Sequence, residues 1–214
     1  MRAIQYIPQG VLLGVVDPGV GTERKPIALE TDWGVMIGPD NGLLNLACAT
    51  VGGAQRGFLL ENENWIIPSE GNTFHARDVF SPFAAGYASG QLAIEEFGSE
   101  LDLSNLNQYL IPLTEVTDNE IKGEILWVDH YGNCQTNISP EELSGLKKSI
   151  GDVVNIKIGN DEMKTTWVDN YQGEYLGEVG LITDSWGMVS LFATNKNASS
   201  ILNIKDGAKI NFLI

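Results

Sequence analysis

Short apolar runs alternate with glycine- and proline-containing turns through the first half of the chain. Residues 11–16 are aliphatic and lie between two such turns, so they predict a central strand that is covered on both faces. Further strands are predicted at 26–31, 33–37 and 65–68, and helical spacing of apolar residues predicts helices starting at 43 and at 79. This mixture of strands and helices is typical of an α/β domain.

The second half of the chain has a different pattern. Short strand-like segments are separated there by Gly, Asn and Asp, at 123–128, 153–158, 164–168 and 209–214. Pro112 marks a natural break between the two patterns. The sequence therefore predicts an N-terminal α/β domain in residues 1–112 and a small C-terminal β-barrel or sandwich in residues 118–214.

Composition argues against two classes of partner. The 214 residues include 13 Lys and Arg against 28 Asp and Glu, and the net charge of −15 argues against binding nucleic acid or an anionic membrane, while it tolerates a cationic small molecule. No run approaches the roughly 18 apolar residues of a membrane span, and no export signal is evident. Cys48 and Cys134 form neither a CxxC pair nor a disulfide framework and do not suggest a metal site, so we expect a cytoplasmic protein.

A charged, glycine-rich loop follows the first predicted strand. Asp17 lies at the carboxyl end of that strand, Pro18 favours an extended backbone before it, and Gly19 and Gly21 allow a ligand to approach the main chain closely. The loop has the parts of a ligand site, although an ordinary tight turn with a solvated aspartate would have the same sequence. The spacing of a phosphate-binding P-loop is absent.

The two histidines lie in two further polar motifs. The segment 73–78 places His75 beside Arg77 and Asp78 just before a predicted helix, where the last two residues are best explained as a cap and salt bridge.

The turn sequence at 39–42 is explained equally well as a simple turn or as a functional loop.

The segment 128–137 combines Asp129 and His130 with an aromatic ring, a glycine and two asparagines. These residues could stack on a flat heterocycle and hydrogen-bond to its polar edge, and the alternative is a β-turn without a function. The segments 184–187 and 195–198 are weaker candidates of the same kind. The sequence lacks GxSxG, HExxH and a GxGxxG between a strand and a helix. It therefore has no sequence motif that indicates a serine nucleophile, a zinc site or a dinucleotide-binding site.

Taken together, four motifs in this order resemble one family: the segments 15–24, 39–42, 73–78 and 128–133 are similar to those of the S-adenosyl-L-methionine (SAM) hydroxide adenosyltransferases. These are adenosine-forming hydrolases related to fluorinating and chlorinating enzymes. The resemblance covers nearly the whole chain. It implies an N-terminal α/β domain, a C-terminal β-barrel, SAM as the substrate without a metal or other cofactor, and a homotrimer with active sites between subunits.

The resemblance also implies roles for individual residues. The catalytic set of the family falls on Asp17, Arg24 and His75, with His75 the better candidate for accepting a proton from the attacking water. The substrate-binding residues fall on Asp129, Tyr131, Asn133, Ser185 and the backbone near Ala198.

The sequence differs from relatives of this family in two respects, and these differences bear on the alternative functions. Halogenating relatives have Tyr at the position of Asp17 and Ser near Ala76, so the residues here favour water over halide as the nucleophile. Family members carry an additional N-terminal segment with an opening strand and an aspartate that holds the ribose, and this segment is expected to be missing here. The alternative from a different functional class is therefore a module that binds SAM or adenosine without turnover. Methyl transfer is disfavoured, because the sequence lacks the glycine-rich loop between strand and helix that is typical of methyltransferases.

Overall fold

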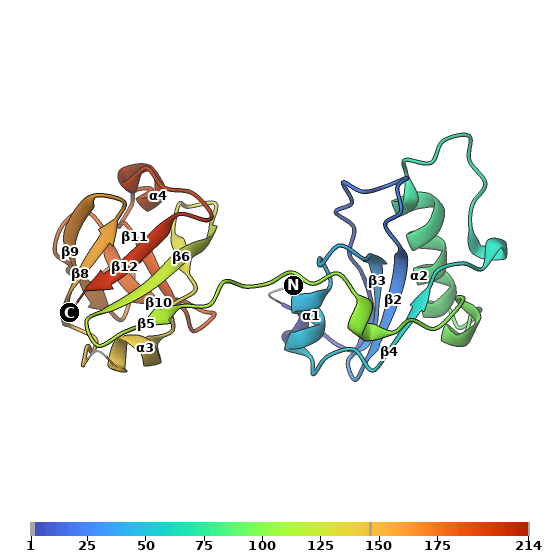
Figure 1. The fold of residues 1–214 in the computed structure, drawn as a ribbon, viewed down its shortest axis with the longest axis horizontal. Helices are drawn as coiled ribbons and strands as arrows, with labels where there is room; N and C mark the ends of the chain where they lie inside the picture. Colours follow the sequence, from blue (N-terminus) through green and yellow to red (C-terminus); the bar gives the residue numbers. More distant parts are fainter. Residues whose placement is uncertain (1–2, 146, 214) are drawn as a thin grey trace. The chain divides into compact units, whose positions relative to one another are not determined.

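The structure, a computed structural model, describes residues 3–145 and 147–213. The chain divides into two compact units, Met1–Leu110 and Ile111–Ile214, each of which has its own sheet and its own hydrophobic core (Figure 1). Among the described residues, no helix has the length and apolar character needed to span a bilayer.

The first unit is built on a four-stranded mixed sheet with the order β1-β3-β2-β4. Strands β2 and β3 are antiparallel, and β1 runs parallel to β3. The strands are β1 (Gly10–Leu13), β2 (Pro26–Thr31), β3 (Gly34–Pro39) and β4 (Arg56–Leu59), and the α-helices are α1 (Asn45–Thr50) and α2 (Ser81–Ala88). Shorter helical turns are Ile4–Tyr6, Glu63–Trp65, the π-helical turn Ala76–Phe80, Ile94–Glu96 and Leu103–Asn105.

Both faces of this sheet are covered. Along β2, Ala28 packs into the cluster around Phe80 and Phe83, while Ile27 and Leu29 pack into the cluster on the other face with α1. This alternation follows from the two-residue period of a strand. Helix α2 lies on one side of the sheet and α1 on the other (Figure 1), which confirms the predicted α/β class.

Two strand predictions in this unit are wrong. Within the described sheet, the strand predicted to be central, β1, pairs only with β3 and lies at an end. It also ends at Leu13, and Asp17 follows after a short extended segment. Residues 65–68 form no strand, because the chain there leaves a helical turn and Trp65 packs against Gly86 of α2. Strand β4 was not predicted.

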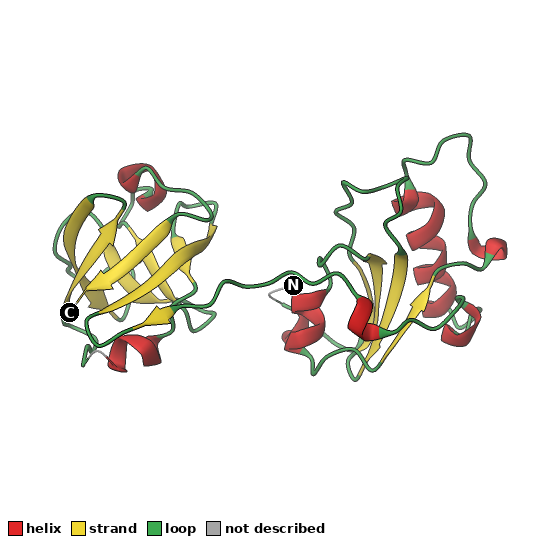
Figure 2. Cartoon of the chain, in the orientation of Figure 1, coloured by secondary structure: helices red, strands yellow, loops and turns green. Residues whose placement is uncertain are grey.

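The second unit is a closed barrel of seven strands. The order β12-β8-β9-β10-β11-β7-β6 closes through the pairing of β12 with β6, and β5 extends the sheet beside β6 (Figure 2). The strands are β5 (Glu115–Val116), β6 (Glu120–Val128), β7 (Cys134–Thr136), β8 (Val153–Ile158), β9 (Asp161–Val168), β10 (Gly180–Thr183), β11 (Val189–Phe192) and β12 (Lys209–Leu213). Two short helices, α3 (Pro140–Gly145) and α4 (Ala198–Leu202), complete the unit.

The predicted barrel is thus confirmed, together with its strands at 123–128, 153–158 and 164–168. The prediction at 209–214 agrees with β12, except that residue 214 lies outside the described residues. The four strands that sequence reasoning missed, β5, β7, β10 and β11, have only two to four residues each. Strand β6 changes partner along its length. Its first half pairs with β12 and β5, and its second half pairs with β7, with a bulge between Ile125 and Trp127. This bend leads directly into the loop that begins at Asp129.

Candidate active site

The loop between Asp17 and Arg24 reverses the chain after β1. Val20 donates a backbone hydrogen bond to the Asp17 carbonyl at 3.2 Å, and Thr22 closes a second turn on the Gly19 carbonyl. Gly21 has φ +77°, a left-handed conformation that favours glycine. These turns bring Arg24 back beside Asp17.

Asp17 and Arg24 form a bidentate ion pair. Arg24 Nε donates to Asp17 Oδ1 at 3.0 Å and Arg24 Nη2 donates to Oδ2, while the side chains are only 5% and 6% exposed. The guanidinium also lies over the Phe80 ring, 5.2 Å from its centre. The third nitrogen, Nη1, is buried and has no hydrogen-bond partner within the described part of the chain. A solvated aspartate in a simple turn is therefore excluded for Asp17, because its charge is held by a buried cation.

His75 joins this ion pair from a distant part of the sequence. It directly precedes the π-helical turn Ala76–Phe80, and its Nδ1 lies 3.0 Å from Arg24 Nη2. Its Nε2 lies 2.7 Å from Oδ1 of Asn72. Partial burial, and then the positive charge of Arg24, hold the pKa of His75 below its usual value. The structure thus brings Asp17, Arg24 and His75 together, and it adds Asn72, which sequence reasoning did not single out.

The neighbouring polar residues are structural. Arg77 pairs with the buried Asp78 through Nε and Oδ1 at 2.6 Å and lies over the Phe74 ring, as the salt-bridge explanation predicts. In the turn at 39–42, the buried Asp40 carboxylate accepts hydrogen bonds from the backbone and side chain of Asn107, and this contact supports the simple-turn explanation.

In the second unit, the loop after β6 is organised by Asp129. Its carboxylate accepts hydrogen bonds from the backbone N–H groups of Tyr131 and Asn133, and from Asn133 Nδ2, each at 2.8 Å. Gly132 has φ +87° and lies against the Asn197 side chain, so a Cβ at this position would collide with it. Asp129 thus shapes the turn that presents Tyr131 and Asn133.

A cavity of about 780 Å³ lies beside this loop, a volume within the usual range for small-molecule sites. Two of the predicted residues, Tyr131 and Asn133, line it. The other residues that line the cavity are Tyr171, Gln172, Phe192, Ala193, Thr194, Asn195, Lys196 and Asn197. The Tyr171 ring meets the Phe192 ring edge-on at 5.2 Å. Tyr171 and Phe192 belong to no common sequence motif, so sequence reasoning did not predict that they line one cavity. The weak candidate segment 195–198 does contribute residues to its lining.

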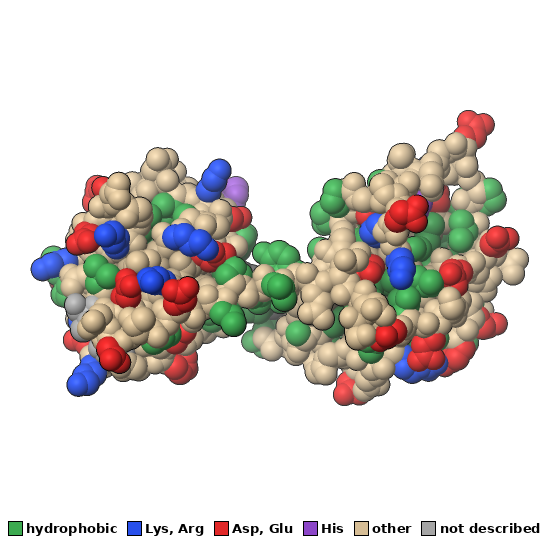
Figure 3. Space-filling model, viewed as in Figure 1, with side chains coloured by type: hydrophobic (Ala, Val, Ile, Leu, Met, Phe, Trp, Pro, Cys, Tyr) green, Lys and Arg blue, Asp and Glu red, His purple; other side chains and the backbone are tan. Residues whose placement is uncertain are grey.

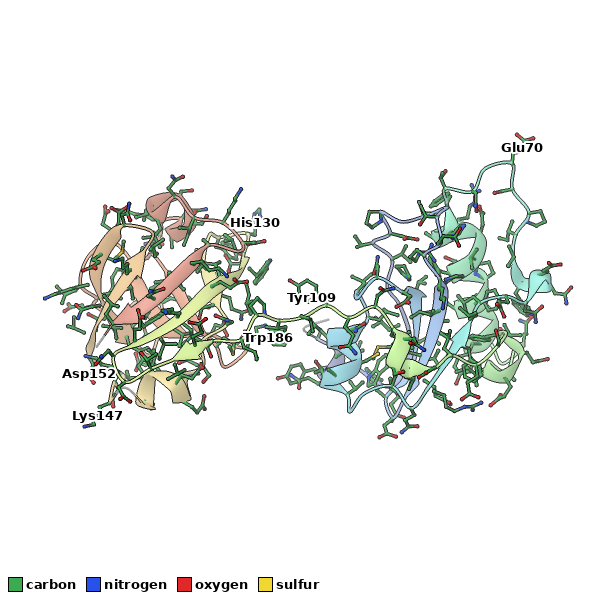
Figure 4. The ribbon with its side chains drawn as sticks, viewed as in Figure 1. Glu70, Tyr109, His130, Lys147, Asp152 and Trp186 are labelled. Atoms are coloured by element: carbon green, nitrogen blue, oxygen red, sulfur yellow. The ribbon has the colours of Figure 1, made fainter. Side chains whose placement is uncertain are left out.

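The remaining predicted residues have other surroundings. Ser185 is exposed in the turn between β10 and β11, which the Asp184 carboxylate organises through the N–H groups of Trp186 and Met188. Ala198 is buried in the barrel core at the start of α4, directly after the cavity residue Asn197. His130 lies at the surface of the second unit (Figure 3; Figure 4). The roles of Ser185 and Ala198 stay predictions.

Other reactive groups offer no second centre in the parts of the chain that the structure describes. Burial raises the pKa of Cys48 to about 11 and that of Cys134 to about 12, so both thiols are protonated near neutral pH. No group of three or more His, Cys, Asp or Glu side chains is arranged to hold a metal ion within residues 3–145 and 147–213.

Comparisons with known proteins agree across both units. The family model for the SAM hydroxide adenosyltransferase N-terminal domain matches residues 1–98, and the model for the C-terminal domain matches residues 123–211. A protein of Salinispora tropica named (R)-S-adenosyl-L-methionine hydrolase is 35% identical over 98% of this chain and 77% of the relative. One of the same name from Thermus thermophilus is 33% identical over 99% of this chain and 79% of the relative.

The fold is similar to that of a solved structure of an uncharacterized conserved protein from Thermotoga maritima. The TM-score is 0.88 and the sequence identity 30%, over the whole of this chain and 80% of that one.

Proposed function

The chain belongs to the SAM hydroxide adenosyltransferase family, and from this premise we propose that it is a SAM hydrolase that forms adenosine and L-methionine. Relatives that share about a third of its residues over nearly its whole length carry the name (R)-S-adenosyl-L-methionine hydrolase. The observation that carries the proposal is the buried Asp17–Arg24 ion pair with His75 against it.

The reaction is the attack of water or hydroxide on C5′ of SAM. The C5′–S bond breaks with its electron pair passing to sulfur, so methionine leaves as a neutral thioether and needs no acid. The difficulty lies with the nucleophile, since water must be held in line with the C–S bond and must lose a proton. The buried carboxylate of Asp17 also attracts the sulfonium cation, and this attraction is stronger in a site without bulk water.

The hydrogen bonds favour Asp17 over His75 as the proton acceptor. An arginine side chain can only donate, so Arg24 Nη2 must point its N–H at the lone pair of His75 Nδ1. The other ring nitrogen, Nε2, is in contact with Asn72. Neither nitrogen is free, whereas each Asp17 oxygen accepts one bond from Arg24 and keeps further acceptor capacity. We therefore propose that Asp17 orients and deprotonates the water. The proposed role of His75 is to support Arg24 through its Nδ1.

The same carboxylate disfavours halide as the nucleophile. A chloride or fluoride ion near C5′ would approach the negative charge of Asp17, whereas a water molecule can donate a hydrogen bond to it. The methyl group of Ala76 offers no hydroxyl donor to an anion.

The cavity of the second unit is our proposed site for the adenosyl group. Its volume and its aromatic lining by Tyr131, Tyr171 and Phe192 suit a flat heterocycle. The side-chain amides of Asn133 and Asn197 can form hydrogen bonds with the polar edge of that heterocycle. Asp129, Ser185 and the backbone near Ala198 remain candidates for further contacts with the substrate, as the family resemblance implies.

We also propose a homotrimer in which each active site takes residues from two subunits. The catalytic set lies in the first unit and the cavity lies in the second. Val16, next to Asp17, is 66% exposed and Tyr131, at the cavity, is 76% exposed, which is unusual for large side chains beside a site that must exclude water.

Incubation of the protein with SAM in ¹⁸O-water tests the reaction. We expect adenosine with the label in its 5′-hydroxyl group, in equal yield with and without EDTA, because the mechanism uses only side chains. A parallel reaction in high chloride should give no 5′-chlorinated nucleoside. Unlabelled adenosine, a halogenated product, or binding of SAM without turnover would contradict the proposal.

A further inference from the structure

Asn72 touches the site but has no role in the mechanism described so far. We propose that Asn72 is a positioning residue, whose side-chain oxygen fixes His75 as the neutral tautomer with its proton on Nε2 and so keeps Nδ1 available to Arg24. The effect on catalysis rests on the proposed function, whereas the effect on His75 can be measured without any substrate.

The hydrogen-bond directions follow from the chemistry of the groups. Arg24 has no acceptor, so the atom that faces it, His75 Nδ1, must carry a lone pair. A neutral imidazole with a lone pair on Nδ1 carries its proton on Nε2. The Nε2–H then donates to Asn72 Oδ1 at 2.7 Å. Each contact in the series from Asn72 through His75 and Arg24 to Asp17 thus joins a donor to an acceptor, and the opposite histidine tautomer would place two donors face to face.

The backbone holds Asn72 in place for this contact. Its loop projects outward at Glu70 (Figure 4) and leads through His75 into the π-helical turn Ala76–Phe80. A Cβ on Gly21 would lie 2.7 Å from the carbonyl oxygen of Asn72, so the two loops are in close contact at a point where only glycine fits. The loop that carries Asp17 and Arg24 therefore packs against the main chain of Asn72. The same loop is linked to the Asn72 side chain by His75, which contacts both Arg24 and Asn72.

Protonation of His75 would break this arrangement. The charged groups that face the ring are Arg24 and Asp17 from the glycine-rich loop and Asp78 from the π-helical turn. Desolvation and Arg24 outweigh the two carboxylates, so the pKa of His75 is lowered and the ring stays neutral to a pH below its ordinary value of about 6.5. In the protonated ring, Nδ1–H would oppose the N–H of Arg24, and the ion pair with Asp17 would lose its support.

Two substitutions of Asn72 separate the acceptor from the charge. Asn72→Asp keeps an oxygen facing Nε2–H and adds a negative charge, which should raise the pKa of His75 by about one unit or more. The acid limb of kcat/KM should then move to higher pH by the same amount. Asn72→Leu removes the acceptor at similar size, so it should not raise the pKa, and kcat should fall about three- to tenfold because the contact is exposed and water can partly replace it.

The decisive measurement is ¹⁵N NMR of the histidine rings in the full chain without substrate. The chain has only two histidines, and His130 serves as the internal reference. Asn64→Asp, at an exposed asparagine in the preceding helical turn, is the control for added charge. We expect His75 in the Nε2–H form in the wild type, and an upward shift of its titration in Asn72→Asp but not in Asn64→Asp.

Three outcomes would overturn the proposal. One is a proton on Nδ1 in the wild type, and the second is an unchanged His75 titration in Asn72→Asp. The third is a shifted titration with an unmoved acid limb of kcat/KM, because His75 protonation would then not affect the reaction. A protein that hydrolyses no SAM would contradict the proposed function alone, since the NMR result stands without substrate.

Discussion

At the scale of single residues, neither Asp17 nor Arg24 could hold its charge in a buried position alone. Removal of a charge from water costs several kcal/mol, and the bidentate contact between the two side chains offsets this cost. The pair therefore places a carboxylate where the proposed reaction needs it. Glu23, a carboxylate in the same loop, is exposed and is not part of this pair.

We predict that Asp17→Asn lowers kcat by about 10²-fold or more, the usual effect of losing a general base. The amide keeps the shape and can still accept a hydrogen bond from Arg24, but it cannot take a proton from water. The matched control is Glu23→Gln, the same loss of charge in the same loop, which should leave kcat unchanged. Near-normal turnover of Asp17→Asn, in a variant shown by circular dichroism to be folded, would move the base role to His75.

At the scale of elements, helix α2 and the π-helical turn before it position His75 against Arg24. Phe80 and Phe83 from these two elements are completely buried in the core. Gly86 of α2 accommodates the Trp65 ring, because a Cβ there would lie 2.4 Å from Trp65 Cζ3. The packing of α2 therefore depends on a glycine inside a helix, where glycine is intrinsically unfavourable.

We predict that Gly86→Ala destabilises the protein by about 1–3 kcal/mol through overpacking, although alanine is the better helix former. Chemical denaturation measures the free energy of unfolding. In a Trp65→Leu background the same substitution should be neutral or stabilising, because the aromatic ring is gone. An equal cost of Gly86→Ala in both backgrounds would show that the Trp65 contact is not the cause.

At the scale of the whole molecule, the two units carry different parts of the proposed chemistry. Asp17, Arg24 and His75 belong to one, and the aromatic cavity with Tyr131 and Asn133 belongs to the other. A trimer with shared sites would unite them, and this can be tested by mixing subunits.

His75→Ala and Asn133→Ala should each be nearly inactive. If the sites are shared, mixed trimers formed after dissociation and reassociation contain some sites with both residues intact, so part of the activity should return. Each variant dissociated and reassociated alone is the control, and sedimentation analysis gives the oligomeric state. A mixture of confirmed trimers that stays inactive would mean that both residues act within one chain.

Local patterns in the sequence determined the class of fold and the positions of the candidate motifs. The alternation at Ile27, Ala28 and Leu29 marks a strand with two buried faces, because side chains in a strand alternate with a period of two. Glycine and proline mark the turns, so the polar motifs after them could be found before any contact was known. Short strands such as β4 and β7 were missed because three or four residues carry too little periodicity.

Only the tertiary structure decided which residues meet. The residues 11–16 are as apolar as a central strand, yet β1 lies at an end of the described sheet, since an apolar run encodes burial but not the number of neighbouring strands. The sequence places His75 51 residues from Arg24, and only packing shows that its Nδ1 faces a group that can only donate. The same packing brings Asn72 onto Nε2 and joins Tyr171 and Phe192 in one cavity. Such contacts depend on long-range chain closure, which no local pattern specifies.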